Sequence, residues 1–232
     1  MILFPPSRYA SIHNHSTFSP FDGLSEPREH IDFCLKNGLD SWSLTDHGNG
    51  NGLAHAHAHA RKVSSKGAKF RQLYGVEFYF VPDLKEWKRT YDISRGLVSD
   101  ETSSDVEDEV AGLVVEDADE TRTEQEDNPN RRYHLVVVAK NRVGLSNLFT
   151  LVKKSFKDGF YKFPRIDFNM LKEHGEGLVV STACVGGYPS GLIYKEFPTA
   201  KFDDLQPGLM DDPASYARIM NRLQNSVDRF VD

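Results

Sequence analysis

The fold of this chain is indicated first by the stretch Ser41-Trp42-Ser43-Leu44-Thr45-Asp46-His47-Gly48. Its first five residues are typical of a strand, which ends at an Asp-His pair followed by glycine. In α/β proteins, functional side chains gather where strands end. Helical patterns flank this strand on both sides, over residues 25–38 and 53–66. The alternation predicts an α/β fold with a parallel sheet, either open or closed into a barrel.

The same alternation continues along the rest of the chain. Further strands are predicted over residues 73–81, 134–139 and 177–182, and a last helix is expected to begin at Asp212-Pro213. Another helix is predicted over Gly144–Lys157, with an apolar face directed inward. The residues expected on that face are Leu145, Leu148, Phe149, Val152 and Phe156.

Composition excludes several classes of protein. Hydrophobic residues make up 39% of the 232-residue chain, enough for a sizeable core. No apolar run approaches the ~18 residues of a membrane-spanning helix, and the first residues lack the pattern of a signal peptide. Two cysteines, Cys34 and Cys184, are too few for a disulfide framework. We therefore expect a protein of the reducing cytoplasm, without a membrane partner.

Acidic charge is concentrated in one segment. Residues 100–127 hold 13 of the 34 acidic residues and a single basic residue, Arg122. The remaining 27 basic and 21 acidic residues leave a mildly basic body, which permits contact with nucleic acid. A like-charged segment without aromatic residues cannot bury enough surface to offset its ordering entropy, so residues from about 97 to 130 are predicted to be a disordered insertion. A solvated linker and a regulatory or DNA-mimicking arm are both compatible with that composition.

Candidate metal ligands begin with the His-x-His pair at His13 and His15. In a strand, residues i and i+2 point to one face, so both imidazoles can reach one ion. Further ligand-type side chains stand at or near the other predicted strand ends: Asp22, His47, Glu77, His134 and Cys184. Mixed imidazole and carboxylate ligands suit Zn²⁺, Mn²⁺ or Fe²⁺. Several ions sharing such a set would activate a water molecule and hold a phosphoryl group.

A second histidine tract, Ala54-His55-Ala56-His57-Ala58-His59-Ala60, has a less specific meaning. Alanine favours a helix, in which only His55 and His59 share a face. We expect a surface pair there, with adventitious metal capture as the alternative.

Taken together, these motifs resemble the PHP (polymerase and histidinol phosphatase) domain. The order His13-x-His15, Thr45-Asp46-His47-Gly48, Gly75-Val76-Glu77, His134 and Cys184-x-Gly186-Gly187 is similar to that family. The similarity is closest to the C-family replicative polymerases, the bacterial DNA polymerase III α subunits. It is carried there by residues 12–23, 134–148, 159–167 and 176–187. It covers most of residues 7–190 except the acidic insertion.

The resemblance implies a distorted TIM-like (βα) barrel with a multi-metal phosphoesterase site, which serves 3′–5′ proofreading in some polymerases. Residue by residue, it implies metal ligation by His13, His15, Asp22, His47, Glu77, His134 and Cys184. Two or three divalent ions, Zn, Mn, Mg or Fe, would be the cofactors. Asp46 and Arg165 are the implied catalytic residues, with Arg165 facing the phosphate. An ion pair between Arg165 and Asp167 is the alternative for that arginine.

One departure from the family pattern bears on the fold. The pattern ends with an Asp-x-His pair on the last barrel strand, and no Asp-x-His occurs in this sequence. We therefore expect residues 1–232 to form a PHP domain that lacks its last strands and is completed by the rest of a polymerase α subunit, in cis or as a separate chain. DNA and other replisome proteins are the expected partners.

Three functions remain open on the sequence. The first is the N-terminal PHP portion of a replicative polymerase. The second is a stand-alone metal-dependent phosphoesterase acting on a small phosphate, against which the missing final ligands count. The third is a non-catalytic scaffold module, against which seven retained candidate ligands count.

Overall fold

The computed structural model describes residues 9–97 and 132–191, together with residues 217, 221 and 224. The acidic segment predicted to be disordered therefore lies outside the described residues, apart from Leu97. The helix predicted from Asp212 also lies outside them, apart from Ala217, Asn221 and Gln224, which are helical. No helix within the described ranges is long and apolar enough to cross a membrane.

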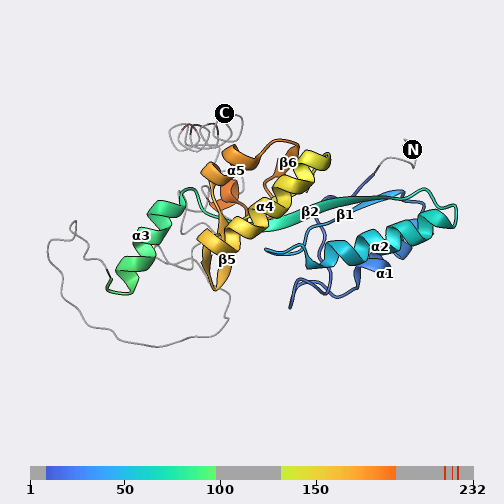
Figure 1. The fold of residues 1–232 in the computed structure, drawn as a ribbon, viewed down its shortest axis with the longest axis horizontal. Coiled ribbons are helices and arrows are strands. Elements are labelled where there is room, and N and C mark those ends of the chain that lie inside the picture. The colour runs from blue at the N-terminus through green and yellow to red at the C-terminus, as the bar shows by residue number, and fades with distance from the viewer. Residues whose placement is uncertain (1–8, 98–131, 192–216, 218–220, 222–223, 225–232) are drawn as a thin grey trace.

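Helices and strands alternate along the described chain, which confirms a mixed α/β architecture (Figure 1). The helices are α1 (Pro27–Lys36), α2 (Asn51–Ser65), α3 (Leu84–Ser94), α4 (Arg142–Asp158) and α5 (Phe168–His174). The strands are β1 (Ser41–Leu44), β2 (Arg71–Phe80), β3 (Tyr133–Ala139), β4 (Phe160–Tyr161), β5 (Phe163–Ile166) and β6 (Leu178–Ser181).

Strand β2 is the longest strand and organises the sheet. Its first four residues pair in parallel with β1, and its last two pair in parallel with β5. Its other edge pairs with β3 from Gly75 to Phe80. The strand order is β4-β5-β2-β3-β6, with β1 also joined to β2, so the described strands form an open sheet.

The expectation of a parallel sheet was wrong for β3, and the short strand β4 is also antiparallel to its neighbour β5. This strand runs antiparallel to both β2 and β6, whereas β1 and β5 run parallel to β2. A parallel neighbour needs a crossover that returns the chain to the starting end of the sheet. Figure 1 shows α3 beyond the end of β2 rather than across the sheet. The chain re-enters at Tyr133, opposite Phe80, and the strand is therefore reversed.

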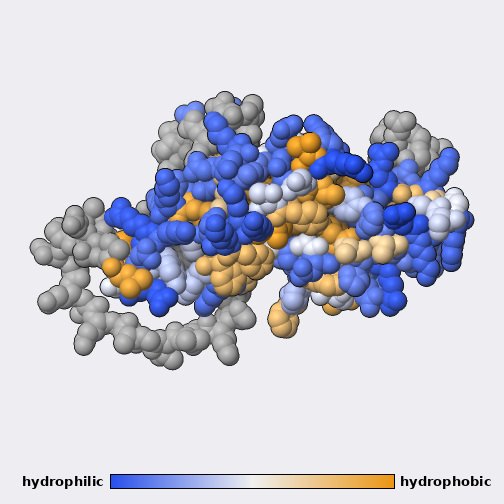
Figure 2. All heavy atoms as spheres, viewed as in Figure 1, coloured by the Kyte–Doolittle hydropathy of each residue, from blue (hydrophilic) through white to orange (hydrophobic). Residues whose placement is uncertain are grey.

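Helix α4 packs against β3 and β5 through a narrower face than the sequence predicts. Its buried residues are Gly144, Leu148, Leu151 and Ser155. Phe149 and Phe156 were expected to point inward, but each is 49% exposed. A Cβ on Gly144 would collide with the backbone of Gly177, so α4 can lie this close to the segment before β6 only with a glycine at that position. Hydrophobic side chains consequently gather at the surface over α4 and β5 (Figure 2).

Candidate functional site

The candidate site is built around Glu77, in the middle of β2. Its side chain is completely buried. Its backbone N–H donates to the Asp46 carbonyl at 3.2 Å, and its carbonyl accepts from the Gly48 N–H at 2.8 Å. Val136 of β3 pairs with Glu77 on the other edge. The chain turns away after β1 at Gly48, whose φ of +64° favours glycine.

Four histidines surround the Glu77 carboxylate. Oε2 lies 2.7 Å from His13 Nε2 and 2.9 Å from His15 Nε2. Oε1 lies 3.0 Å from His134 Nδ1. His47 Nδ1 is 3.6 Å from Oε2. Three segments that are distant in sequence therefore bring histidines to one buried carboxylate, as their placement near strand ends predicts.

The His-x-His pair reaches Glu77 from an extended segment and not from the predicted strand. Ser11 forms an isolated parallel bridge with Trp42, and Asn14 exchanges hydrogen bonds with Thr45. The segment thus runs beside β1 without becoming a sheet strand. Its side chains still alternate, because Asn14 donates to the Ser43 carbonyl while the rings of His13 and His15 lie with centroids 5.0 Å apart.

The two remaining predicted ligands lie at the rim of this cluster. Asp22 Oδ2 is 3.3 Å from His47 Nε2 and 3.5 Å from His15 Nδ1, and its side chain is 48% exposed. Cys184 is exposed, with Sγ 3.7 Å from His134 Nδ1 and 4.0 Å from Glu77 Oε1. The structure therefore brings all seven predicted ligands to one region.

The charges in this cluster depend on one another. Burial by itself would raise the pKa of Glu77, but hydrogen bonds from His134, His15 and His13 hold it well below its ordinary value. Burial lowers the pKa of His47 to about 4, with repulsion from His15 and His134 in the same direction. Burial also acts to lower the pKa of His15, but the hydrogen bond and charge of Glu77 outweigh it and raise that pKa. A carboxylate among imidazoles, one of them neutral at pH 7, is a suitable donor set for a cation.

The donor atoms fall into three overlapping groups, each with its ligand atoms within 4.8 Å of one another. The groups are His13–His15–Glu77, His15–Asp22–His47 and His47–Glu77–His134. Nδ1 of His47 is buried without a hydrogen bond among the described residues, as expected of an imidazole available to a metal. Imidazole and carboxylate donors suit Zn²⁺, Mn²⁺ or Fe²⁺. The residues present fit a multi-metal centre.

Neither predicted catalytic residue points into the cluster. The buried carboxylate of Asp46 accepts hydrogen bonds from the Ser16 N–H, the Ser16 hydroxyl and the Ser19 hydroxyl. Arg165 is also fully buried, and its Nη1 donates to the carbonyls of Tyr161 and Phe163. Its guanidinium lies 4.6 Å from the ring centroid of Trp87. These contacts favour structural roles for both residues, and their catalytic roles remain predictions.

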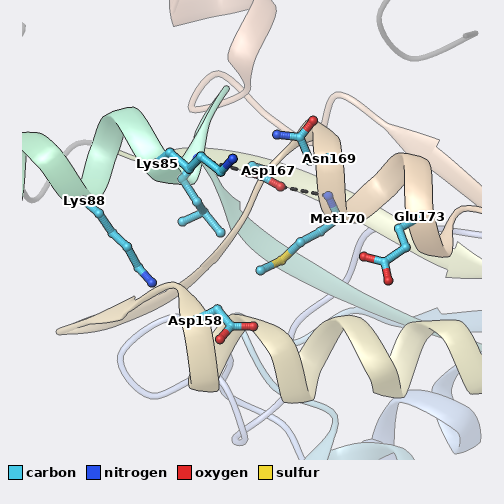
Figure 3. A pocket seen from close by; sticks show the side chains of 8 residues that line it. Lys85, Lys88, Asp158, Asp167, Asn169, Met170 and Glu173 are labelled. Atoms are coloured by element: carbon cyan, nitrogen blue, oxygen red, sulfur yellow. Dashed lines mark hydrogen bonds between the residues drawn. The ribbon is translucent and has the colours of Figure 1, made fainter.

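The alternative ion pair between Arg165 and Asp167 is not among the contacts that the structure shows for Asp167. That carboxylate accepts the backbone N–H groups of Leu84 and Met170, and so joins the starts of α3 and α5. It also lines a cavity of about 220 Å³, together with Lys85 and Glu173 (Figure 3). None of the predicted site residues lines this cavity, so it is separate from the histidine cluster.

Two residues of the site were missed by sequence reasoning. Tyr79 stacks on His47, with ring centroids 5.5 Å apart, and packs edge-on against His134. Its position two residues after Glu77 on the same strand face is the signal that could have found it. Ser19 is completely buried between Asp46, His15 and His47. A single serine in a turn follows no periodic pattern, so the sequence does not mark Ser19 as a site residue.

The histidine tract of α2 lies outside this site. The predicted helix is confirmed, and His59 pairs with Asp32 of α1 at 2.7 Å. His57 contacts the hydroxyl of Tyr74 at 2.6 Å. Among the described residues, this tract belongs to no group of three metal-ligand side chains.

Comparison with known proteins identifies the class. A family model described as the PHP domain matches residues 11–228, and this chain therefore belongs to the PHP domain family. Its relatives are DNA polymerase III α subunits, to whose N-terminal region it is distantly homologous.

Two relatives show how low the sequence identity is. The chain is 29% identical over 196 residues to the DNA polymerase III subunit alpha of Borreliella burgdorferi, covering 84% of this chain and 14% of that protein. It is 29% identical over 184 residues to the same subunit of Aquifex aeolicus, covering 78% and 13%. The chain thus spans about one seventh of the length of these relatives.

One solved structure is also similar, that of a proposed metal-dependent phosphoesterase from Bifidobacterium adolescentis. It is 14% identical with a TM-score of 0.33, and the match covers 63% of this chain and 32% of that one. At that score the likeness carries no argument.

Proposed function

We propose that this chain is the N-terminal PHP portion of a replicative DNA polymerase III α subunit and carries a multi-metal phosphoesterase site. The convergence of His13, His15, His47 and His134 on the buried carboxylate of Glu77 is the observation that supports it most. A buried anion ringed by imidazoles from separate segments has no simple structural purpose, because packing alone would favour apolar residues there.

In this proposal the seven predicted ligands hold two or three divalent ions. Bound ions of this kind activate water and stabilise charge on a phosphoryl group. Glu77 and the four histidines form the inner donors, while Asp22 and Cys184 reach the centre from its exposed side. Tyr79 forms one side of the site, because its ring stacks on that of His47. Asp46 accepts hydrogen bonds from Ser16 and Ser19 and so holds their loop against the ligands. It affects the centre through the position of these ligands.

The finer architecture and the partners belong to the same proposal. The described strands would be part of a distorted βα barrel of the PHP type, whose Asp-x-His ligands come from outside these 232 residues. DNA, the rest of the polymerase subunit and other replisome proteins would be its partners, in the cytoplasm. The similarity to DNA polymerase III α subunits supports this placement.

Hydrolysis of DNA 3′ ends tests the proposal. The 232-residue chain, stripped with EDTA and reloaded with Mn²⁺ or Zn²⁺, is incubated with a primer–template carrying a mismatched 3′ end, and with bis(p-nitrophenyl) phosphate. We expect metal-dependent release of 3′ nucleotides that His13→Ala lowers by about 100-fold or more, because a loosely held centre positions water poorly. His57→Ala is the matched control, since that histidine contacts Tyr74 outside the cluster.

Each outcome has a consequence for the proposal. Metal binding without hydrolysis of either substrate, both by this chain alone and with the polypeptide that supplies the Asp-x-His pair, would favour the scaffold module. Fast hydrolysis of the small ester with no action on DNA would favour the stand-alone phosphoesterase. Absence of metal binding by the folded chain would overturn the proposed centre altogether.

A further inference from the structure

The hydroxyl of Ser19 lies where three site residues meet. Ser19 is completely buried, in the turn that precedes Asp22. Its Oγ accepts the backbone N–H of His47 at 2.8 Å and donates to Asp46 Oδ1 at 3.2 Å. The same oxygen is 3.3 Å from Nδ1 of His15. One hydroxyl therefore contacts the backbone of one predicted ligand and the ring of another.

The direction of the third contact follows from counting protons. A serine hydroxyl has one proton to donate and two lone pairs to accept with. The N–H of His47 occupies one lone pair. A carboxylate is a stronger acceptor than a neutral imidazole nitrogen, so the hydroxyl proton goes to Asp46. The remaining lone pair faces His15, whose Nδ1 must then carry a proton.

The opposite nitrogen of His15 faces the centre. Its Nε2 is 2.9 Å from Glu77 Oε2 and 3.1 Å from His13 Nε2. On the Nδ1 side the second near neighbour is Asp22 Oδ2, another acceptor, at 3.5 Å. Without a metal, Nε2 donates to Glu77 Oε2. A cation that takes the place of the Nε2 proton finds the Nδ1 proton still held by two acceptor oxygens, so it binds at Nε2.

The turn holds Ser19 in this position through its backbone. The Ser19 N–H donates to the Ser16 carbonyl at 2.8 Å, and the Gly23 N–H donates to the Ser19 carbonyl at 3.0 Å. A Cβ on Gly23 would collide with the Ser16 carbonyl, so the chain can close at this point only with glycine. The hydroxyl is thus fixed before any ligand arrives.

We propose that Ser19 is a positioning residue of the metal centre, whose hydroxyl, oriented by Asp46, accepts from His15 Nδ1–H and His47 N–H and so directs His15 Nε2 to the metal. This inference rests on the proposed function, because it requires these histidines to bind a cation. Partners that hold the second nitrogen of a metal-ligating histidine fix its tautomer and raise its affinity for the ion.

Metal affinity tests the role. Zn²⁺ is titrated calorimetrically into the EDTA-stripped chain and into Ser19→Ala, with the melting temperature of each variant measured without metal. We expect Ser19→Ala to bind about 10–100-fold more weakly. Ser155→Ala is the matched control, because Ser155 is an equally buried serine whose hydroxyl donates to the Val152 carbonyl within α4, away from the histidine cluster. Its affinity should stay close to that of the unmodified chain, and Ser19→Thr should restore binding.

A second measurement needs no variant and covers the case in which Ser19→Ala does not fold. Long-range ¹H–¹⁵N spectra of the Zn²⁺-loaded chain should show His15 protonated at Nδ1 and metal-bound at Nε2. Metal binding through Nδ1 would overturn the inference, as would equal Zn²⁺ affinities for Ser19→Ala and Ser155→Ala. If the unmodified chain binds no Zn²⁺, Mn²⁺ or Fe²⁺, the proposed function itself fails.

Discussion

The carboxylate of Glu77 lies 2.7 Å from Nε2 of His13, although 64 residues separate them in the chain. Neither residue is held there by local structure alone. Glu77 is placed by the pairing of β2, and His13 by an extended segment beside β1. The centre therefore forms only when the sheet is assembled, and its charges contribute to the stability of the sheet that assembles it.

Glu77→Gln should show what the negative charge of Glu77 contributes, independently of the size of its side chain. The substitution keeps the size of the side chain but removes the anion to which three histidines are hydrogen bonded. We expect Zn²⁺ affinity to fall by about 100-fold or more, because a coordinating carboxylate is lost. The metal-free chain should lose about 1–3 kcal/mol in the free energy of unfolding, measured in urea. Glu173→Gln, which breaks the exposed pair with Lys154, should leave stability nearly unchanged, because solvent screens that pair.

Titration of His47 should lower the stability of the metal-free chain as the pH falls from about 6.5 to about 4, the ordinary and folded pKa values of this group. In this window His47 binds a proton in the unfolded chain but not in the folded chain. Folding therefore becomes less favourable as the pH decreases. The contribution of this group is at most roughly 3 kcal/mol.

Unfolding in urea with EDTA at pH 7.5, 6 and 5 measures that slope. His47→Asn should reduce it, and His57→Asn should not. His15 acts in the opposite sense, because its raised pKa contributes stability below pH 6.5 that is lost at higher pH. The test is therefore the difference between His47→Asn and His57→Asn in the slope of unfolding free energy against pH, and not the slope of either variant alone. Equal slopes in both would show that His47 titrates normally.

Arg165→Met should destabilise the fold by about 1–3 kcal/mol, since it leaves the partly buried carbonyls of Tyr161 and Phe163 without this donor. Arg61→Met, at an exposed position on α2, is the control. Urea denaturation measures both. If Arg165→Met instead left stability unchanged and raised KM for a phosphoester substrate, the phosphate-facing role would be correct and the structural one wrong.

The two cysteines should differ in their response to metal. Cys34 is buried, and burial raises its thiol pKa, whereas Cys184 is exposed beside His134. A thiol reagent such as DTNB should therefore modify Cys184 first, and saturating Zn²⁺ should slow that reaction because a bound thiolate is no longer free to attack. Cys184→Ser should remove the fast phase. An unchanged rate with Zn²⁺ would exclude Cys184 from the ligand set.

Local patterns were sufficient to predict the strand ends on which the candidate ligands lie. The run from Ser41 to Thr45 alternates and stops at Asp46-His47-Gly48, and β1 ends at Leu44 as that pattern indicates. Glu77 within a strand and His134 near the start of one were predicted in the same way. Periodicity and turn residues act over a few positions, so a single sequence carries them.

Tertiary structure alone decided the direction of β3, the burial of Arg165 and the connection of Ser19 to His15 and His47. The direction of β3 depends on where the chain re-enters the sheet. The sequence of α3 does not indicate whether that helix crosses the sheet. Arg165 and Asp46 carry the same charges whether they face a substrate or hold a loop, and only the packing around them distinguishes these roles. Such choices are set by contacts between segments tens of residues apart, whose pairing no local pattern specifies.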